Sequence, residues 1–220
     1  MYSGGFWRSV LAFFVPNVCP FCGRVIGVSE YWCEECQLSL PYIDPPKELP
    51  EGLDGLYVCC SYTGRAKAAI LRMKRGGFRF SPAALPLLMT ERCAEILPQV
   101  DIVTDVPSGL RRQIELGYAH SRMIARDIAR RSKKPYRRSL KTAASKAEQK
   151  SLTRAQRFEN AKDAFIAINK EYINENNILL VDDVCTTGAT LSAAASLMKK
   201  NGANKVYAVT FALVVLDKNS

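Results

Sequence analysis

No stretch of this sequence is apolar for long enough to cross a lipid bilayer. The longest charge-free apolar runs, such as Val206 to Leu216, fall well short of the roughly 20 residues that a membrane-spanning helix needs. The first 16 residues contain a short apolar run but no A-x-A cleavage site, which favours a short packed helix over a signal peptide. We therefore expect a soluble, cytoplasmic protein without membrane insertion.

Histidine is almost absent, and acidic residues are in the minority. The chain of 220 residues has one His, and its 31 Lys and Arg against 21 Asp and Glu give a formal charge of +10. A content of 48% hydrophobic and 24% charged residues excludes a disordered chain, and the length suggests one ordinary domain with a smaller unit attached. The single His120 is expected to be structural or solvated.

Cysteines are plentiful by contrast, and four of the eight have a specific spacing. Cys19 and Cys22 form one C-x2-C pair, Cys33 and Cys36 form the next, and ten residues separate the pairs. Such an array can place four thiolates tetrahedrally around one structural Zn²⁺, and Gly23 supplies the positive φ that such a turn often needs. Two disulfides are the alternative, which requires an oxidising compartment. A catalytic zinc is disfavoured, since four sulfurs leave no position for water.

Composition also predicts the domain boundaries. The stretch from Pro41 to Gly55 is rich in Pro, Gly and acid and is typical of a linker. We therefore expect an N-terminal helix and zinc-ribbon-like module over residues 1–42, a linker over 43–55 and a larger domain over 56–220.

The larger domain alternates strand and helix patterns. Strands are predicted at Leu56 to Thr63, Asp101 to Pro107, Asp163 to Ala167, Asn177 to Asp182 and Lys205 to Leu216. Helices are predicted at 65–74, from about Pro82 through the LPLLMTERCAEIL run, at 119–131 and at 190–200. This alternation predicts an α/β fold with a parallel sheet, whose ligands bind beyond the carboxyl ends of the strands.

One strand end has the composition of a phosphate site. From Ile178 to Thr190 the chain reads as a buried strand, two acids, a hydroxyl-rich loop with Gly188, and a helix. The unpaired N–H groups at a helix start, with nearby hydroxyls, form a cradle for phosphate, and Asp182 and Asp183 suit the vicinal diol of a ribose. Alternatively, one loop threonine caps the helix while the acids solvate the strand end.

The same string resembles a known family motif. A hydrophobic strand followed by D-D-x-x-T-T-G-x-T is similar to the phosphoribosyl pyrophosphate motif of type I phosphoribosyltransferases, and Ile178 to Thr190 matches it throughout. A four-cysteine module ahead of such a domain further resembles the competence-associated ComF family. The resemblance implies a Rossmann-like phosphoribosyltransferase domain that binds phosphoribosyl pyrophosphate with Mg²⁺.

The resemblance also implies residue roles. Asp182 and Asp183 would contact the ribose hydroxyls, Lys74 would contact pyrophosphate, and Arg111 and Arg112 would lie in a hood that closes over the site. The 5′-phosphate would be held by Cys185, Thr186, Thr187, Gly188, Ala189 and Thr190. The acids and the two hood arginines are thus the candidate catalytic residues. Asp105 departs from the family pattern, because an acid replaces an apolar or Pro residue.

The excess charge is concentrated in one region. Residues 111–162 hold 16 Lys and Arg against four acids, a net charge of +12, which leaves −2 for the rest. A basic surface with interleaved aromatics such as Tyr118, Tyr136 and Phe158 is typical of single-stranded nucleic acid binding, although a merely solvated face remains the alternative. The candidate contacts are Arg130, Arg131, Lys133, Lys134, Arg137 and Arg138.

Two functions remain open at this point. The first is a protein of DNA uptake that binds phosphoribosyl pyrophosphate and single-stranded DNA, with DNA-uptake proteins as partners. The second is a metabolic phosphoribosyltransferase that acts on an unidentified base or amine and releases pyrophosphate.

Overall fold

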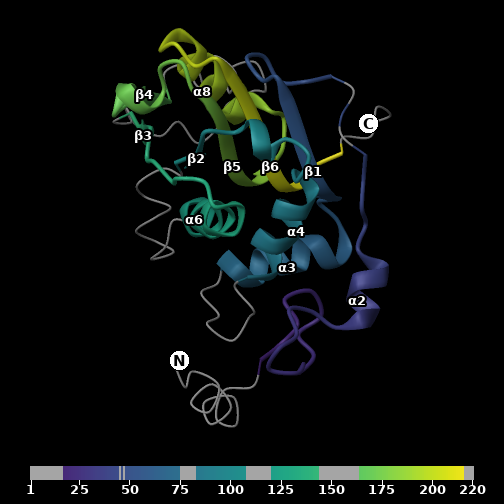
Figure 1. The fold of residues 1–220 in the computed structure, drawn as a ribbon. Coiled ribbons are helices and arrows are strands. Elements are labelled where there is room, and N and C mark those ends of the chain that lie inside the picture. The colour runs from purple at the N-terminus through teal and green to yellow at the C-terminus, as the bar shows by residue number, and fades with distance from the viewer. Residues whose placement is uncertain are drawn as a thin grey trace, which may run out of the picture.

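A four-stranded parallel sheet forms the centre of the molecule (Figure 1). The computed structural model describes residues 17–44, 46, 48–74, 83–107, 120–143 and 164–215. In spatial order the strands are β1 (Gly55–Ser61), β6 (Lys205–Leu213), β5 (Asn177–Cys185) and β2 (Ile102–Asp105). The inner strands β5 and β6 are almost continuously buried and apolar, as expected where helices cover both faces of a sheet. The predicted α/β class is confirmed.

Helices pack on the two faces in unequal numbers. One face carries α3 (Gly64–Lys74), α4 (Ala84–Arg92) and α6 (His120–Ser132), and the other carries α8 (Ala189–Lys200). Figure 1 shows this division, with the sheet between α8 and the other three helices. Alternate β5 residues serve the two cores, since Leu179 packs toward α6 and Leu180 toward α8. The carboxyl ends of β5 and β2 lie beside the start of α6, because Ser121 contacts Asp182 and Arg122 lies near Asp105.

A second, smaller sheet lies outside the main one. Strands β3 (Leu140–Thr142) and β4 (Phe165–Ala167) pair antiparallel with each other. The strand predicted at Asp163 to Ala167 therefore belongs to this pair and not to the parallel sheet, and its described part begins at Ala164. Leu140 and Phe165 are both buried in the core beneath α8, which explains why so short a pair is held in place.

The four-cysteine segment packs directly on the α3 face. Val18 and Val25 form a short antiparallel bridge, and the chain between them turns at Gly23. The φ of Gly23 is +82°, which confirms the positive φ predicted there. Helix α2 (Glu34–Ser39) follows. Phe21 is 1% exposed and stacks on Phe211 of β6 at 6.1 Å between ring centroids. The module and the sheet thus share one apolar core.

The acidic, Pro-rich segment after the module follows the sheet closely. The amide of Ile43 donates to the Cys59 carbonyl, and the amide of Asp54 donates to the Val206 carbonyl. The boundaries at 42/43 and 55/56 stay a prediction.

The second predicted helix is shorter than expected. It ends at Arg92, and a turn and a 3-10 segment (Leu97–Gln99) lead into β2, while residues 81 and 82 lie outside the described part. Another 3-10 segment (Lys170–Tyr172) precedes β5. None of the helices in the described residues is both long and apolar enough to span a membrane. The N-terminal helix predicted within the first 16 residues also lies outside the described part.

Candidate sugar-phosphate site and four-cysteine centre

Two adjacent acids near the carboxyl end of β5 are held by different elements. Asp182 Oδ1 accepts hydrogen bonds from Ser121 Oγ of α6 at 2.9 Å and from the amide of Asp183 at 2.8 Å. Asp183 is 9% exposed, and its Oδ2 lies 2.7 Å from Lys74 Nζ at the end of α3. The structure therefore brings the predicted acids and the predicted lysine together.

The environment of Asp182 disfavours its charge. Burial, and then the charge of the adjacent Asp183, raise the pKa of Asp182 to about 7, against the lowering effect of its two hydrogen bonds and of Lys74. Within the described residues Lys74 pairs with Asp183, so a further cation or a set of hydroxyl donors would favour ionisation of Asp182 as well. Such a site is chemically suited to polyhydroxyl ligands and to divalent metal ions.

The loop after β5 opens a helix without a capping side chain. Gly188 is the N-cap of α8 with φ +78°, and no side-chain oxygen caps the helix there. The bond from the Ala189 amide to Thr187 Oγ1 is long, at 3.4 Å. The alternative in which a loop threonine caps α8 is therefore poorly supported, and the amides and hydroxyls of this loop can serve an anion. Thr186 and Thr190 are exposed.

Glycine is required at position 188 for two reasons. The left-handed φ is strained for other residues, and a Cβ there would lie 2.8 Å from Cγ of Pro50. Pro50, in the segment that was predicted to be a linker, thus lies against the loop between β5 and α8, a contact that spacing along the chain could not reveal.

The first residues of α6 lie beside the acidic pair. His120 is 9% exposed, and its Nε2 lies 3.0 Å from the Met73 carbonyl, which can only accept, so this nitrogen carries the proton. Burial lowers the pKa of His120, although the Met73 bond and the charge of Asp183 raise it. These contacts agree with a structural role for the single histidine. Sequence reasoning did not single out Ser121 as a partner of Asp182, because the two residues are 61 positions apart in the chain.

The unexpected acid at the end of β2 is buried and compensated. Asp105 is 2% exposed; the hydroxyl of Tyr136 donates to its Oδ1 at 2.5 Å, and Arg122 Nε lies 3.5 Å from its Oδ2. Burial first, and then the Asp105 carboxylate, raise the pKa of Tyr136 to about 12. Asp105 and Arg122, the residue after Ser121, therefore form an ion pair between the end of β2 and the first turn of α6, although Arg122 Nε makes no hydrogen bond within the described residues.

The four cysteines of the array converge on one point. Their sulfur atoms all lie within 4.8 Å of one another, and Cys22 Sγ and Cys33 Sγ are 3.7 Å apart. A tetrahedral zinc with Zn–S bonds of about 2.3 Å has sulfur–sulfur edges of about 3.8 Å, so this cluster fits a metal ion of that size. All eight cysteines are free thiols in the structure, which disagrees with the disulfide alternative.

Positive side chains flank the four-cysteine cluster. Arg65 of α3 donates to Cys36 Sγ at 3.3 Å and to Glu35 Oε1, and Arg24 pairs with the same glutamate. Although burial raises it, the pKa of Cys22 is lowered to about 7 by the Arg24 amide and the neighbouring thiols. Burial is the main cause that raises the pKa of Cys33 and the pKa of Cys36, so the surroundings favour the thiolate at Cys22 and disfavour it at these two positions.

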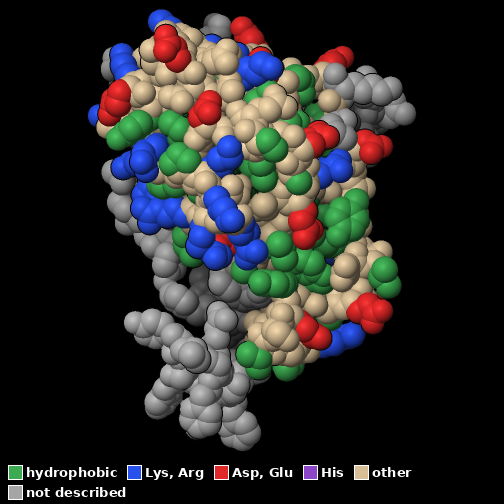
Figure 2. Space-filling model, in the orientation of Figure 1, with side chains coloured by type: hydrophobic (Ala, Val, Ile, Leu, Met, Phe, Trp, Pro, Cys, Tyr) green, Lys and Arg blue, Asp and Glu red, His purple; other side chains and the backbone are tan. Residues whose placement is uncertain are grey.

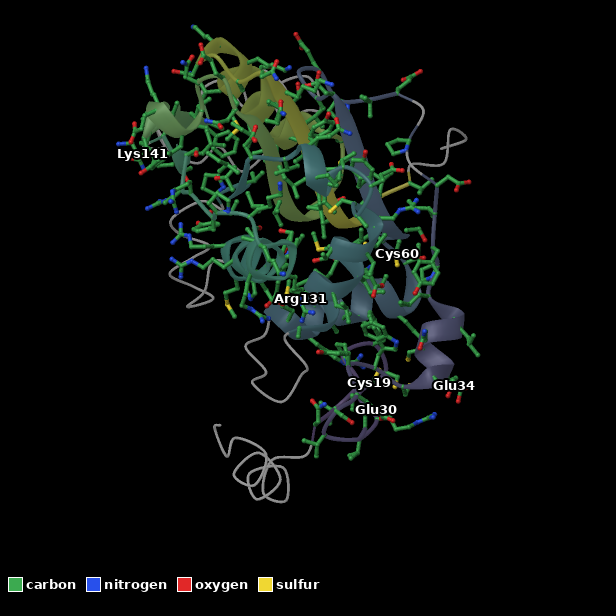
Figure 3. The ribbon with its side chains drawn as sticks, viewed as in Figure 1. Cys19, Glu30, Glu34, Cys60, Arg131 and Lys141 are labelled. Carbon is green, nitrogen blue, oxygen red and sulfur yellow. The ribbon has the colours of Figure 1, made fainter. Side chains whose placement is uncertain are left out.

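The predicted nucleic-acid residues differ in exposure and in their partners within the protein. Arg131 binds Asp127 at 2.8 Å and its guanidinium lies 5.8 Å from the Tyr31 ring centroid, while Lys134 Nζ reaches the Pro98 carbonyl. Figure 2 shows Lys and Arg gathered over α6 and the segment after it, and Figure 3 labels Arg131 and Lys141 there. The exposed members are Arg130, Lys133, Arg137 and Arg138, of which Arg130 also pairs with Asp127 and Arg137 lies 5.2 Å from the Tyr172 ring centroid.

Several predicted residues lie outside the described part of the chain. These are the hood arginines Arg111 and Arg112 and the aromatics Tyr118 and Phe158. The third aromatic, Tyr136, is turned toward Asp105.

Comparisons with known proteins find matches over the part of the chain that contains the acidic pair. Residues 120–220, which include the acidic pair, the loop and α8, match the phosphoribosyl transferase domain model. Competence protein F of Haemophilus influenzae is 26% identical over 194 residues, 85% of this chain and 82% of the relative. Together with the four-cysteine cluster, these findings confirm the resemblance stated from the sequence.

Solved structures include two similar enzymes. The allosteric regulatory enzyme of purine biosynthesis is 19% identical with a TM-score of 0.43, over 60% of this chain and 26% of that one, so this chain spans about a quarter of it. A purine phosphoribosyltransferase of Pyrococcus horikoshii is 16% identical with a TM-score of 0.34, over 61% of this chain and 76% of that one.

Proposed function

We propose, for a chain in which a ComF-like four-cysteine module precedes a phosphoribosyl transferase domain, that the end of β5 binds phosphoribosyl pyrophosphate. The observation that carries the proposal is the convergence of Asp182, Asp183 and Lys74 beside a helix start that no side chain caps. Carboxylates accept hydrogen bonds from the ribose hydroxyls. A lysine can neutralise the charge of the pyrophosphate, and backbone amides can bind the 5′-phosphate.

Each residue has a defined task in this proposal. The two carboxylates accept hydrogen bonds from the ribose hydroxyls, with Ser121 orienting Asp182. The 5′-phosphate lies against the amides and hydroxyls of Cys185 to Thr190. Lys74, now paired with Asp183, neutralises pyrophosphate charge when the ligand arrives. Mg²⁺, carried on the pyrophosphate, supplies further charge neutralisation for the leaving group. Arg111 and Arg112 complete the predicted hood.

Calorimetry with phosphoribosyl pyrophosphate and MgCl₂ tests the site. Replacing both acids, Asp182→Ala with Asp183→Ala, is expected to weaken binding at least about 10-fold, because charged hydrogen-bond acceptors are lost. Asp127→Asn is the matched control, since this acid pairs with arginines of α6 away from the acidic pair. Equal affinity of the double variant and the wild type, with the fold intact by circular dichroism, would refute the site.

The four-cysteine cluster is proposed to hold one structural Zn²⁺. Four sulfurs at these separations fill a tetrahedral shell and leave no position for water, so the ion supports the module and not the chemistry.

A second function is favoured by the exposed cations and by the name of the Haemophilus relative. We propose that the surface formed by Arg130, Lys133, Arg137 and Arg138 binds single-stranded DNA during DNA uptake in the cytoplasm, together with DNA-uptake proteins. Such binding falls with salt because each neutralised phosphate releases counterions.

Binding of a fluorescent oligonucleotide across a salt series tests this surface. Replacing Arg137 and Arg138 by Ala should reduce the slope of log K against log salt by about 1.4, the value for two single-strand phosphate contacts. Lys200→Ala with Lys205→Ala removes the same charge from other exposed positions and should leave the slope unchanged. Equal slopes for both double variants would argue against the surface.

Pyrophosphate release distinguishes a metabolic enzyme from a DNA-uptake protein. If the chain releases pyrophosphate from phosphoribosyl pyrophosphate with one member of a panel of bases and amines, it is a phosphoribosyltransferase of that acceptor. If it binds the ligand without release, the pocket serves as a ligand or regulatory site.

A further inference from the structure

The last turn of α3 touches three other parts of the molecule through three consecutive residues. Arg72 reaches the four-cysteine module, the Met73 carbonyl contacts His120 at the start of α6, and Lys74 pairs with Asp183 of β5. The proposed sugar-phosphate site and the metal centre therefore meet at one helix end. Figure 1 shows α3 between the module and the rest of the domain.

Arg72 is bound to the first cysteine pair through its backbone. Its Nη1 donates to the Pro20 carbonyl at 3.1 Å and to the Phe21 carbonyl, and both carbonyls lie between Cys19 and Cys22. A Cβ built on Gly23 would lie 3.7 Å from Arg72 Nη2, so the guanidinium packs against the turn that follows this pair. These carbonyls have the required direction only while the turn is folded, and the cysteines on either side of it are ligands of the proposed metal.

The other end of α3 is attached to the module as well. Arg65 donates to Cys36 Sγ, the Ser39 hydroxyl and the Glu35 carboxylate of the second pair and α2. Two arginines seven residues apart on one helix thus hold the two halves of the module. Arg72 differs from Arg65 in that it lies two residues from the lysine of the sugar-phosphate site.

We propose that Arg72 is a positioning residue for Lys74, through which the folded, metal-bound module sets the pyrophosphate side of the site. This inference rests on the proposed function, because it assigns a regulator to the same site. Lys74 ends its helix, and residues at a helix end lack the full set of backbone bonds that fix interior residues. Anchoring Arg72 on the module limits the positions that Lys74 can take.

The alternative is that core packing alone holds α3, and it predicts the opposite result. Ala66, Ala69 and Ile70 are buried in the sheet-side core, and this packing could hold α3 without any help from the module. In that case the loss of Arg72 would leave Lys74 in place. The two cases differ in whether Arg72 and Lys74 contribute to ligand binding independently.

A double-mutant cycle on the zinc-loaded full chain separates the two cases. The variants are Arg72→Met, Lys74→Met and the double variant, with Lys67→Met as an exposed α3 control that removes the same charge. The probe is phosphoribosyl pyrophosphate with MgCl₂ in calorimetry. Zinc content and thermal unfolding are measured on each variant, so that a loss of metal or fold is seen directly.

If Arg72 acts through Lys74, Arg72→Met keeps one zinc per chain and weakens binding at least about fivefold, the lower end of coupling between sites in proteins. Adding Arg72→Met to Lys74→Met then weakens binding no further. Lys67→Met stays within about twofold of the wild type. Unchanged affinity in Arg72→Met, or additive losses in the double variant, would overturn the proposal.

Hydrogen exchange tests the same link without the ligand. Removing zinc with a chelator should speed amide exchange in the peptide that covers residues 69–74 of wild type, and Arg72→Met should show this faster exchange even with zinc bound. Unchanged exchange in both cases would also overturn the positioning role. A wild type that shows this exchange response but no heat with phosphoribosyl pyrophosphate would contradict the proposed function alone.

Discussion

At the scale of single residues, the candidate site is defined by acids in unusual surroundings. Asp182 accepts two hydrogen bonds and still has a raised pKa, because burial and Asp183 outweigh them. Asp105 is more deeply buried than Asp182 but has both a tyrosine hydroxyl and an arginine as partners. The charge of Asp105 is thus compensated by partners within the protein, whereas the charge of Asp182 is not fully compensated, which agrees with the proposed ligand site.

The raised pKa of Asp182 predicts how stability depends on pH in the ligand-free protein. Between its ordinary pKa of 3.8 and the folded value of about 7, the folded state binds more protons than the unfolded one. Stability contributed by this group therefore falls as pH rises from about 4 to about 7, by at most about 4 kcal/mol.

Thermal unfolding at pH 4.5 to 8 checks this prediction. Asp182→Asn, which cannot ionise, should lose less stability over that range than the wild type, whereas Asp127→Asn should follow the wild type. Parallel curves for Asp182→Asn and the wild type would contradict the assigned pKa.

At the scale of elements, the turn between β5 and α8 combines a left-handed glycine with a close neighbour. Gly188→Ala has both the strain of φ +78° and a Cβ 2.8 Å from Pro50. Gly64→Ala, at φ +45° with open space around it, has the backbone strain alone. We expect the first change to lower the free energy of unfolding by about 2–3 kcal/mol and the second by about 1 kcal/mol.

Urea unfolding of both variants measures the difference. Equal losses in the free energy of unfolding would mean that Pro50 can move away from the loop between β5 and α8 at no energetic cost. The contact between Pro50 and this loop would then contribute nothing to stability.

The elements also show what a sequence can and cannot predict. Strand β5, the acidic pair and Gly188 were all predictable, because a buried strand, two acids and a glycine-opened helix are consecutive in the chain. Strand β3 was not, since three residues carry no period, and Leu140 is held by pairing with β4 and by burial in the core beneath α8, which both involve distant segments. The partners of the acids, Ser121 and Lys74, come from distant segments, and the residue spacing gives no distance between them.

At the scale of the whole molecule, the four-cysteine cluster and the sheet are parts of one core. Phe21 lies between Cys19 and Cys22 and stacks on Phe211 of β6, and the buried residues of the module and of α3, α4 and α6 form one cluster. A change at the cysteines should therefore lower the stability of the domain that carries the proposed sugar-phosphate site.

Cys33→Ser tests this integration. Three sulfurs and a hydroxyl no longer match the zinc shell, so we expect loss of the bound zinc. Because the cores are continuous, the melting midpoint of the single main transition should fall by about 5–10 °C, which corresponds to about 2–3 kcal/mol at this chain length. Cys93→Ala is the control, since this buried thiol donates to the Met89 carbonyl away from the array and should keep one zinc per chain. One zinc per chain in Cys33→Ser would contradict the ligand set, and an unchanged sheet transition beside a separate early one would show that the module unfolds alone.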